Sequence, residues 1–113
     1  MHELSITQSI VDSAIAHARQ EKVQRVLSVT VEIGALSGVV PDAVEFCYAS
    51  VTQGTLLDGT PLIIDWIPAR GRCGECGQEQ EIGNYFEVCD HCGGYGFTVL
   101  QGEELRIKEL EVE

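Results

Sequence analysis

The sequence Cys-Gly-Glu-Cys-Gly at residues 73–77 returns as Cys-Asp-His-Cys-Gly at residues 89–93, with the same spacing of cysteine and glycine. Each Cys-x-x-Cys step is a tight turn that directs two sulfur atoms at one point. Two such steps supply four thiolates, which form the closed tetrahedral shell of a structural zinc ion. The spacing therefore predicts a zinc site without an open coordination position, made by Cys73, Cys76, Cys89 and Cys92.

The segment that carries these cysteines, residues 70–97, is rich in glycine and has little apolar periodicity. A module of about 28 residues buries too little apolar surface to fold alone. Its fold is therefore expected to depend on the metal. The glycine after each second cysteine suits a tight knuckle whose backbone amides donate hydrogen bonds to sulfur.

Other uses of these cysteines fit the pattern less well. Iron in a rubredoxin-like site is the main alternative metal, because iron also accepts four thiolates. A thioredoxin-like dithiol would leave the second cysteine pair unused. The odd total of five cysteines argues against a secreted disulfide framework and favours a reducing cytosol. Outside the site, Cys47 is expected to be a buried apolar residue, and His91 to face solvent.

The first third of the chain predicts a helix followed by a strand. Residues 5–21 carry an apolar stripe at helical spacing. Ser5 and Gln8 match a capping box, so residues 1–4 are expected to be an extended lead-in. Residues 23–33 alternate between apolar and polar side chains, which is typical of a half-buried strand.

The remaining sequence predicts one more helix and two more strands. The helix begins at Pro41, shows an apolar face that includes Val40, and stops at Gly54. Residues 62–67 form a strand. Residues 104–112 form another, in which the apolar side chains change parity, and either a β-bulge near Lys108 and Glu109 or two short strands would reconcile them.

This order of elements predicts an α+β fold, with two helices on a three-stranded mixed sheet and an inserted four-cysteine zinc ribbon. Residues 1–69 and 98–113 would form the α/β domain, and residues 70–97 the inserted metal-binding domain. No stretch reaches the roughly 18 apolar residues of a membrane span, and the N-terminus lacks a basic signal region. We therefore expect a cytoplasmic protein without membrane insertion.

The charge of the chain argues against nucleic-acid binding. Acidic residues outnumber basic ones by 18 to 7, giving a formal net charge of -11. Zinc ribbons that bind nucleic acid do so with basic side chains, but only Arg70 and Arg72 lie next to this ribbon. An acidic surface is compatible with cations or a basic protein partner, or it serves solubility alone. The ribbon is crowded by carboxylates, namely Glu75, Glu79, Glu81, Glu87 and Asp90.

The N-terminal pair Met1-His2 has a specific chelating chemistry. The free α-amine, the backbone nitrogen of His2 and its imidazole close two fused chelate rings on one metal, and the backbone nitrogen of Glu3 is a further donor. Nitrogen-rich tetragonal sites suit Ni(II) and Cu(II). The carboxylates of Glu3 and Asp42 are candidate extra ligands, or acceptors for the imidazole. On chemistry alone, a histidine at this position is more often part of a frayed terminus, and His17 is expected to be a partly buried structural residue rather than a ligand.

Taken together, these stretches resemble the HypA/HybF family, the nickel metallochaperones of [NiFe]-hydrogenase maturation. The resemblance runs from end to end: Met-His-Glu-Leu-Ser-Ile at residues 1–6, Val-Glu-Ile-Gly at 31–34, the paired cysteine steps, Gly-Glu-Glu-Leu at 102–105 and Leu-Glu-Val-Glu at 110–113. Two departures stand out. Many relatives have proline where this chain has Gly74 and Asp90, and a basic residue where it has Glu103.

The resemblance implies a nickel-binding α/β domain and a zinc ribbon. His2 would be the principal nickel ligand, with the Met1 amine and the Glu3 backbone contributing, and the four cysteines would hold structural zinc. It also implies work beside a HypB-type nickel-insertion GTPase and delivery to the [NiFe]-hydrogenase large-subunit precursor. The sequence leaves open whether the chain is a monomer or a homodimer. Some relatives also serve urease.

Three other function classes compete with a metallochaperone. A zinc-ribbon protein-interaction module would hold zinc and transfer no metal. A rubredoxin-like electron carrier would hold iron and be coloured. An enzyme is disfavoured, because the three histidines are scattered and the sequence has no nucleophile motif or phosphate loop.

Overall fold

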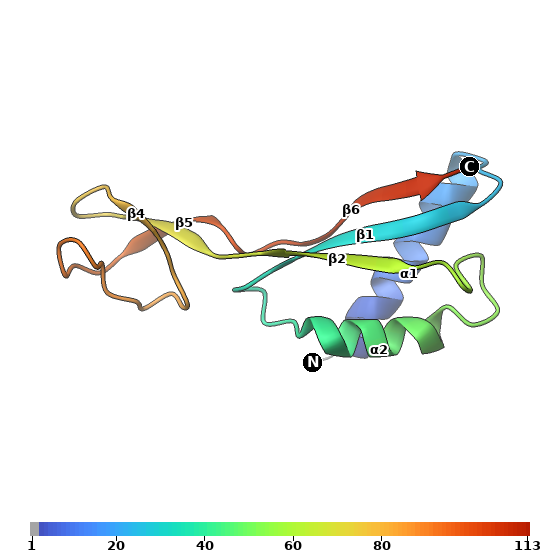
Figure 1. Cartoon of the computed structure of the whole chain (residues 1–113), viewed down its shortest axis with the longest axis horizontal. Coiled ribbons are helices and arrows are strands. Elements are labelled where there is room, and N and C mark those ends of the chain that lie inside the picture. Colours follow the sequence, from blue (N-terminus) through green and yellow to red (C-terminus); the bar gives the residue numbers. More distant parts are fainter. Residues whose placement is uncertain (1–2) are drawn as a thin grey trace.

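The computed structural model describes residues 3–113 and is elongated, with extents of 54 × 26 × 17 Å along its principal axes. Two three-stranded sheets lie toward opposite ends, and both helices lie beside the first sheet (Figure 1). Neither described helix is long and apolar enough to cross a membrane. The predicted architecture, two helices on a mixed sheet with a four-cysteine module inserted, is confirmed.

The first helix, α1, spans Glu3–Gln20 and so begins before its predicted start at Ser5. The predicted capping box is wrong, as is the extended lead-in where it falls on described residues. A glutamate in the first turn complements the helix dipole, so Glu3 favours this longer helix. The side chain of Gln8 donates to Asp12 one turn later (2.9 Å) instead of reaching back.

The helix ends in a Schellman turn that also sets where the first strand starts. Lys22 adopts a left-handed conformation (φ 56°), and its N–H donates to the carbonyl of Arg19 (3.1 Å). The N–H of Val23 donates to the carbonyl of Ala18 (3.2 Å), which completes the motif. Val23 is therefore part of the turn, and strand β1 spans Val26–Gly34 rather than starting at the predicted position.

Strand β1 lies in the centre of the first sheet. It runs parallel to β2 (Leu62–Ile67) and antiparallel to β6 (Leu105–Val112), in the order β2-β1-β6. A crossover that contains the second helix joins the parallel pair, because a tight hairpin cannot connect parallel strands. After the cysteine module, β6 pairs with the other edge of β1 and makes the sheet mixed.

The predicted β-bulge in the last strand is confirmed. Thr30 opposes Glu109, whereas the next residue of β1 opposes Ile107. Lys108 is therefore an extra residue in β6. Because of this bulge, Ile107 and Leu110 both pack against the core despite their three-residue spacing.

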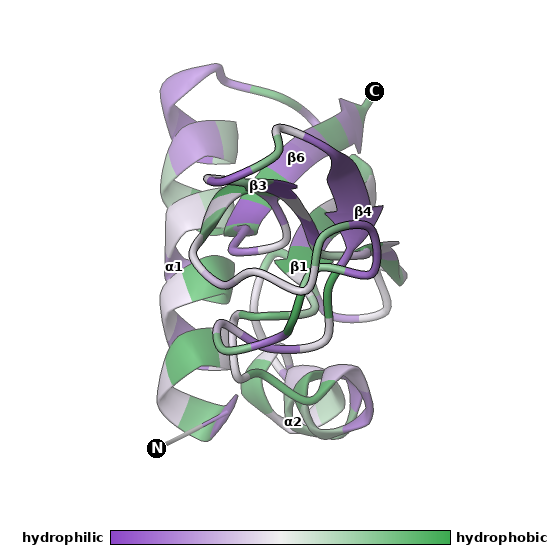
Figure 2. Ribbon diagram, turned by 90° about the vertical axis from the view of Figure 1, so that its left-hand side faces the viewer, coloured by the Kyte–Doolittle hydropathy of each residue, from purple (hydrophilic) through white to green (hydrophobic). Residues whose placement is uncertain are grey.

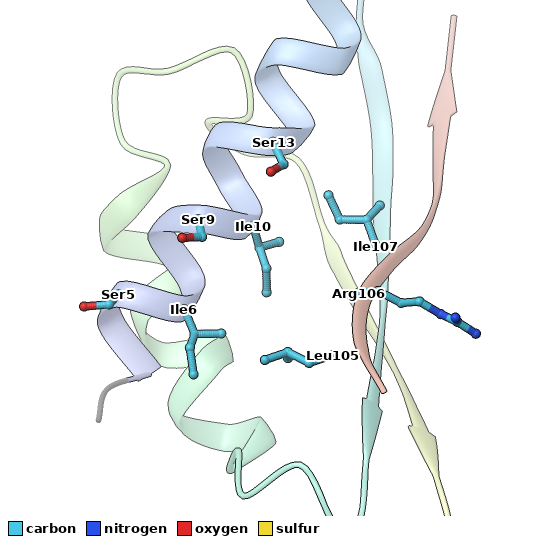
Figure 3. Close-up of a pocket in the computed structure, with 8 residues that line it drawn as sticks. All are labelled: Ser5, Ile6, Ser9, Ile10, Ser13, Leu105, Arg106 and Ile107. Atoms are coloured by element: carbon cyan, nitrogen blue, oxygen red, sulfur yellow. The ribbon is translucent and has the colours of Figure 1, made fainter. Parts of the chain in front are cut away.

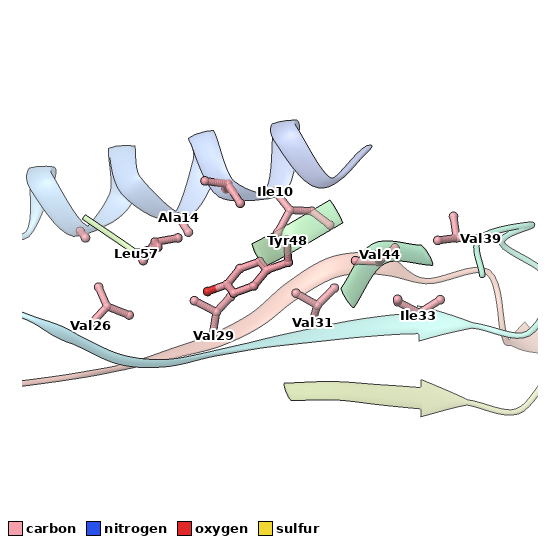
Figure 4. Packing of buried hydrophobic residues seen from close by; sticks show 12 residues of the cluster. Ile10, Ala14, Val26, Val29, Val31, Ile33, Val39, Val44, Tyr48 and Leu57 are labelled. Atoms are coloured by element: carbon pink, nitrogen blue, oxygen red, sulfur yellow. The ribbon is translucent and has the colours of Figure 1, made fainter. Parts of the chain in front are cut away.

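Both helices cover one face of the first sheet and enclose the core (Figure 4). The opposite face carries two ion pairs: Glu32 of β1 pairs with Arg106 of β6, and Asp65 of β2 pairs with Lys108. Figure 2 shows hydrophilic residues along β6 and β4. The most deeply buried side chains of the core come from α1, β1, α2 and the loop after α2: Val11, Ala14, Val29, Val31, Ile33, Val44 and Leu57.

The second helix, α2, spans Pro41–Val51, with proline in its first turn as predicted. Its predicted apolar face is wrong at one position. Val40 is 55% exposed while Val39 is 6% exposed. The backbone at Val40 is still extended (φ -92°, ψ 115°), so adjacent side chains point in opposite directions there.

The second sheet has the order β4-β3-β5, formed by β3 (Arg70–Cys73), β4 (Glu79–Glu81) and β5 (Phe97–Gln101). The predicted division between residues 97 and 98 falls within β5. This strand has only five residues and follows a glycine-rich segment, so the sequence did not reveal where it begins and ends. The chain passes between the two sheets twice, at residues 68–69 and 102–104. Whether the two parts are separate domains remains a prediction.

Candidate metal centre

The sulfur atoms of the four predicted cysteines converge beside the second sheet. Cys73 ends β3, Cys76 lies in the turn that follows, and the other two come from the loop before β5. All four Sγ atoms lie within 4.8 Å of one another, with 3.6 Å between Cys73 and Cys92 and 3.7 Å between Cys76 and Cys89. A tetrahedron with Zn–S bonds of about 2.3 Å has edges of about 3.8 Å, so the cluster fits a zinc ion.

The two cysteine turns share one backbone design. The N–H of Gly77 donates to the carbonyl of Cys73 (2.9 Å), and the N–H of Gly93 donates to the carbonyl of Cys89 (2.8 Å). Both glycines have a left-handed φ, +79° and +74°, which a side chain would disfavour. The repeated glycine therefore closes each turn behind its cysteine pair.

Backbone amides also point at the sulfur atoms. The N–H of Glu75 donates to Sγ of Cys73, and the N–H of Gly94 donates to Sγ of Cys92, both at 3.4 Å. Amide donors stabilise thiolates, so they prepare the sulfurs to act as ligands.

The pKa values of Cys73 and Cys92 are shifted in opposite directions. Backbone donation from Cys76 and Glu75 lowers the pKa of Cys73 to about 7. At Cys92, the amide of Gly94 favours the thiolate, but burial and the neighbouring sulfurs outweigh it and raise the pKa to about 12. Four thiolates in this space therefore need a cation to compensate their charge.

Glu75 holds the two cysteine turns together. Its Oε2 accepts a hydrogen bond from the backbone N–H of Tyr95 (3.1 Å), which lies beyond the second turn. The N–H of Gly74 also donates across the module, to the carbonyl of Gly96 (3.0 Å). In the sequence Glu75 counted only as one of the acidic residues around the ribbon, since no spacing rule marks this contact.

A second contact outside the predicted set joins the module to the rest of the molecule. The hydroxyl of Tyr85 donates to the carboxylate of Glu103 (2.6 Å), in the segment that leads back to the first sheet. This bond raises the pKa of Tyr85, because the carboxylate accepts the phenolic proton. Glu103, which stands where many relatives have a basic residue, is thus hydrogen-bonded to Tyr85 of the cysteine module.

Among the candidate ligands that the structure describes, those outside the four cysteines are not gathered into a second cluster. Met1 and His2 lie outside the described residues. Glu3 is half-buried at the start of α1, and Asp42 is exposed in the first turn of α2. His91 is exposed as expected, whereas His17, which was expected to be partly buried, is exposed as well. Within residues 3–113, the four cysteines are the only group of three or more His, Cys, Asp or Glu side chains with this convergence.

The family model described as "Hydrogenase/urease nickel incorporation, metallochaperone, hypA" matches residues 1–112. The chain belongs to the HypA family. Curated relatives named hydrogenase maturation factor HypA support this assignment over the whole chain. The relative from Geobacter metallireducens is 55% identical, and the one from Geobacter sulfurreducens 52% identical, each over 100% of both chains. The relative from Nostoc punctiforme is 49% identical over 100% of this chain and 96% of its own.

Solved structures agree with the HypA assignment at the level of the fold. The solution structure of the Ni metallochaperone HypA from Helicobacter pylori matches with a TM-score of 0.67 over 99% of this chain and 97% of that one. A second solution structure of a HypA protein also has a TM-score of 0.67, over 100% and 97%. Sequence identities of 23% and 22% limit both comparisons to the fold.

Proposed function

We propose that this HypA-family chain is a non-enzymatic nickel metallochaperone that binds Ni(II) at its N-terminus and delivers it during maturation of a [NiFe]-hydrogenase. The observation that carries the proposal is the family match over residues 1–112, which includes both the N-terminal pair and all four cysteines. The descriptions of the family and of its curated members name nickel incorporation and hydrogenase maturation.

The proposed nickel ligands are the α-amine of Met1, the backbone nitrogen and imidazole of His2, and the backbone nitrogen of Glu3. The position of Glu3 supports its part in this set. Glu3 is the first described residue of α1, and the first four N–H groups of a helix have no carbonyl partner within the helix. Its amide is therefore free of the helix hydrogen-bond ladder. The carboxylates of Glu3 and Asp42 remain candidate outer ligands.

Zinc, rather than the nickel cargo, is the metal proposed for the four cysteines. Cys73 and Cys89 are each 2% exposed, and a closed shell of four thiolates holds its ion without a position for exchange. An N-terminal chelate, in contrast, lets an acceptor replace the donors one at a time. We therefore assign the two metals to the two parts of the chain, zinc as structural ion and nickel as cargo.

The proposed partners are a HypB-type nickel-insertion GTPase and the precursor of the hydrogenase large subunit, in the cytoplasm. The net charge of -11 supports protein rather than nucleic-acid partners. Monomer and homodimer are both compatible with this role.

A complementation experiment tests delivery. The untagged chain is expressed in a bacterium that lacks its own HypA, and hydrogenase activity is measured at low nickel. Wild type and His17→Ala should restore activity, whereas His2→Ala should not, and added nickel should partly rescue that variant. Full activity of His2→Ala at low nickel and normal protein level would favour the zinc-ribbon interaction module without transferable metal.

A further inference from the structure

A shallow groove runs along the β6 edge of the first sheet, on the side of the sheet that the helices cover, between α1 and β6. It consists of two adjoining hollows of about 490 and 610 Å³, which share Ser13 and Ile107 and so form one elongated depression. Figure 3 shows apolar side chains from both elements turned toward its first half. These side chains are Ile6, Ile10, Leu105 and Ile107.

The strand that borders this groove has a free edge. Within the described residues β6 pairs only with β1, so its outer N–H and C=O groups have no strand partner. The bulge at Lys108 divides this edge into two short stretches. Ile107 and Leu110 are only partly buried beneath α1. An extended chain laid along β6 would pair with its backbone and place alternate side chains over this apolar floor.

The charges around the groove favour a basic occupant. Arg106 points away from the groove in Figure 3 and pairs with Glu32 on the opposite face of the sheet, and Lys108 pairs with Asp65 (3.1 Å). Both cations of β6 are thus already neutralised.

One unpaired carboxylate remains at the other half of the groove. Glu21 lines it and is in no salt bridge within the described part of the chain. Glu109 also borders it, but the pairing with Thr30 turns its side chain to the opposite face of the sheet. Together with the net charge of -11, Glu21 attracts lysine or arginine. A second copy of this chain would bring the same negative charge and is disfavoured for that reason.

We propose that this groove binds an extended, basic segment of a partner protein, which adds to β6 as a fourth strand. Apolar side chains at alternate positions of the segment would lie over Ile10 and Ile107. A lysine or arginine would lie near Glu21. This docking surface requires neither nickel nor the N-terminal chelate, so its test is independent of metal transfer.

The test adds an eight-residue peptide of alternating lysine and valine to the zinc-loaded, full-length protein. NMR then measures the amide exchange rates and chemical shifts of the protein. The peptide should slow exchange along residues 105–112 and shift signals of residues 5–21. Peptides with glutamate in place of lysine, or with backbone N-methyl groups on alternate residues, should bind at least about tenfold more weakly, because they lose charge attraction or strand pairing.

Matched variants then locate the site on the protein. Ser13→Met fills the groove from an exposed helix position and should weaken peptide binding about tenfold. Ala16→Met, which adds the same side chain at another exposed position of α1, should leave it unchanged. Glu21→Lys should weaken binding and its salt dependence more than Glu45→Lys, an equal change of charge on α2.

Several outcomes would overturn the proposal. Peptide-induced changes confined to the β2 edge or to the cysteine module would place the site elsewhere. Equal binding of the glutamate peptide would remove the basic partner. A dimer in sedimentation, with β6 protected before any peptide is added, would show that a second copy covers the groove. Unchanged exchange along β6 at millimolar peptide would also contradict strand addition.

Discussion

Gly34 and Gly102 pack backbone against backbone where the two sheets meet. A Cβ atom on Gly34 would lie 2.1 Å from the carbonyl oxygen of Gly102. The N–H of Gly34 donates to the carbonyl of Glu104 (2.8 Å), and the N–H of Leu36 donates to the carbonyl of Gly102 (2.7 Å). The end of β1 is thereby fixed directly to the segment that returns from the metal module, so these two glycines help set how the module is joined to the sheet.

Replacing Gly34 should disrupt this junction. Because the obstructing atoms are backbone, Gly34→Ala cannot be relieved by a side-chain rotation and should cost about 3 kcal/mol of unfolding free energy. Urea unfolding measures the loss. The matched control is Gly83→Ala, whose Cβ would meet only the end of the Glu87 side chain at 3.3 Å. Equal stability of the two variants would show that the junction yields easily.

The buried hydroxyl of Tyr48 should contribute to stability. It donates to the backbone carbonyl of Thr60 (2.9 Å) inside the core. Tyr48→Phe removes this donor and should cost about 1 kcal/mol at pH 7, because the carbonyl loses a partner in a buried position. The free energy of unfolding from urea curves provides the check, and a gain in stability would mean that the carbonyl finds another donor.

The same residue predicts a difference at alkaline pH. Burial raises the pKa of Tyr48 from about 10 to about 12, so the folded chain keeps a proton that the unfolded chain loses in this interval. The contribution of Tyr48 to stability is therefore fully present below pH 10, and it should fall by about 1.4 kcal/mol per pH unit between pH 10 and about pH 12. Tyr48→Phe should show a correspondingly shallower decline. Parallel pH profiles of the two proteins would argue against a buried, neutral phenol.

Zinc removal should unfold the module but spare the first sheet. The module has few buried apolar residues, whereas the core lies between the helices and β1. Cys76→Ser, or a strong chelator, should therefore expose the amides of β3, β4 and β5 to exchange while those of β1 remain protected. Hydrogen exchange with mass spectrometry distinguishes the regions. Loss of protection in both sheets at once would show that the chain folds as a single cooperative unit.

Zinc binding should release protons at neutral pH. Burial, and after it the neighbouring sulfurs, raise the pKa values of Cys76 and Cys92, so both thiols are protonated in the metal-free chain at pH 7. The metal-bound site holds thiolates, so about two or more protons should leave and zinc affinity should rise with pH. Calorimetry in buffers of different ionisation enthalpy counts the protons. A value near zero would mean that the thiolates form before zinc arrives.

The sequence allowed most of the architecture to be predicted, because its periodicities and cysteine spacing reflect local physics. The parity change in the last strand, for example, indicated a bulge or two short strands, and the structure has a bulge at Lys108. The errors fall where a contact between residues distant in sequence, or a backbone angle, determines the exposure of a side chain or the start of an element. Val40 is exposed because the chain is still extended there, and Val23 belongs to a turn that Lys22 closes.

Within the metal site, the four cysteines could be predicted from the sequence. The hydrogen bonds that hold the surrounding loops could not. The role of Glu75 depends on a hydrogen bond to Tyr95, twenty residues away, and the partner of Glu103 is Tyr85 in a loop of the module. Neither contact leaves a pattern in the sequence. The N-terminal nickel ligands remain a prediction.

A Ni(II) titration of zinc-loaded protein with its native N-terminus tests the central claim most directly, with His2→Ala and His17→Ala beside it. The account predicts one tight nickel site in the wild type and in His17→Ala, its loss in His2→Ala, and one retained zinc ion in all three. Equal nickel binding by His2→Ala, or displacement of zinc by the added nickel, would contradict the assignment of cargo to the N-terminus and structural metal to the cysteines.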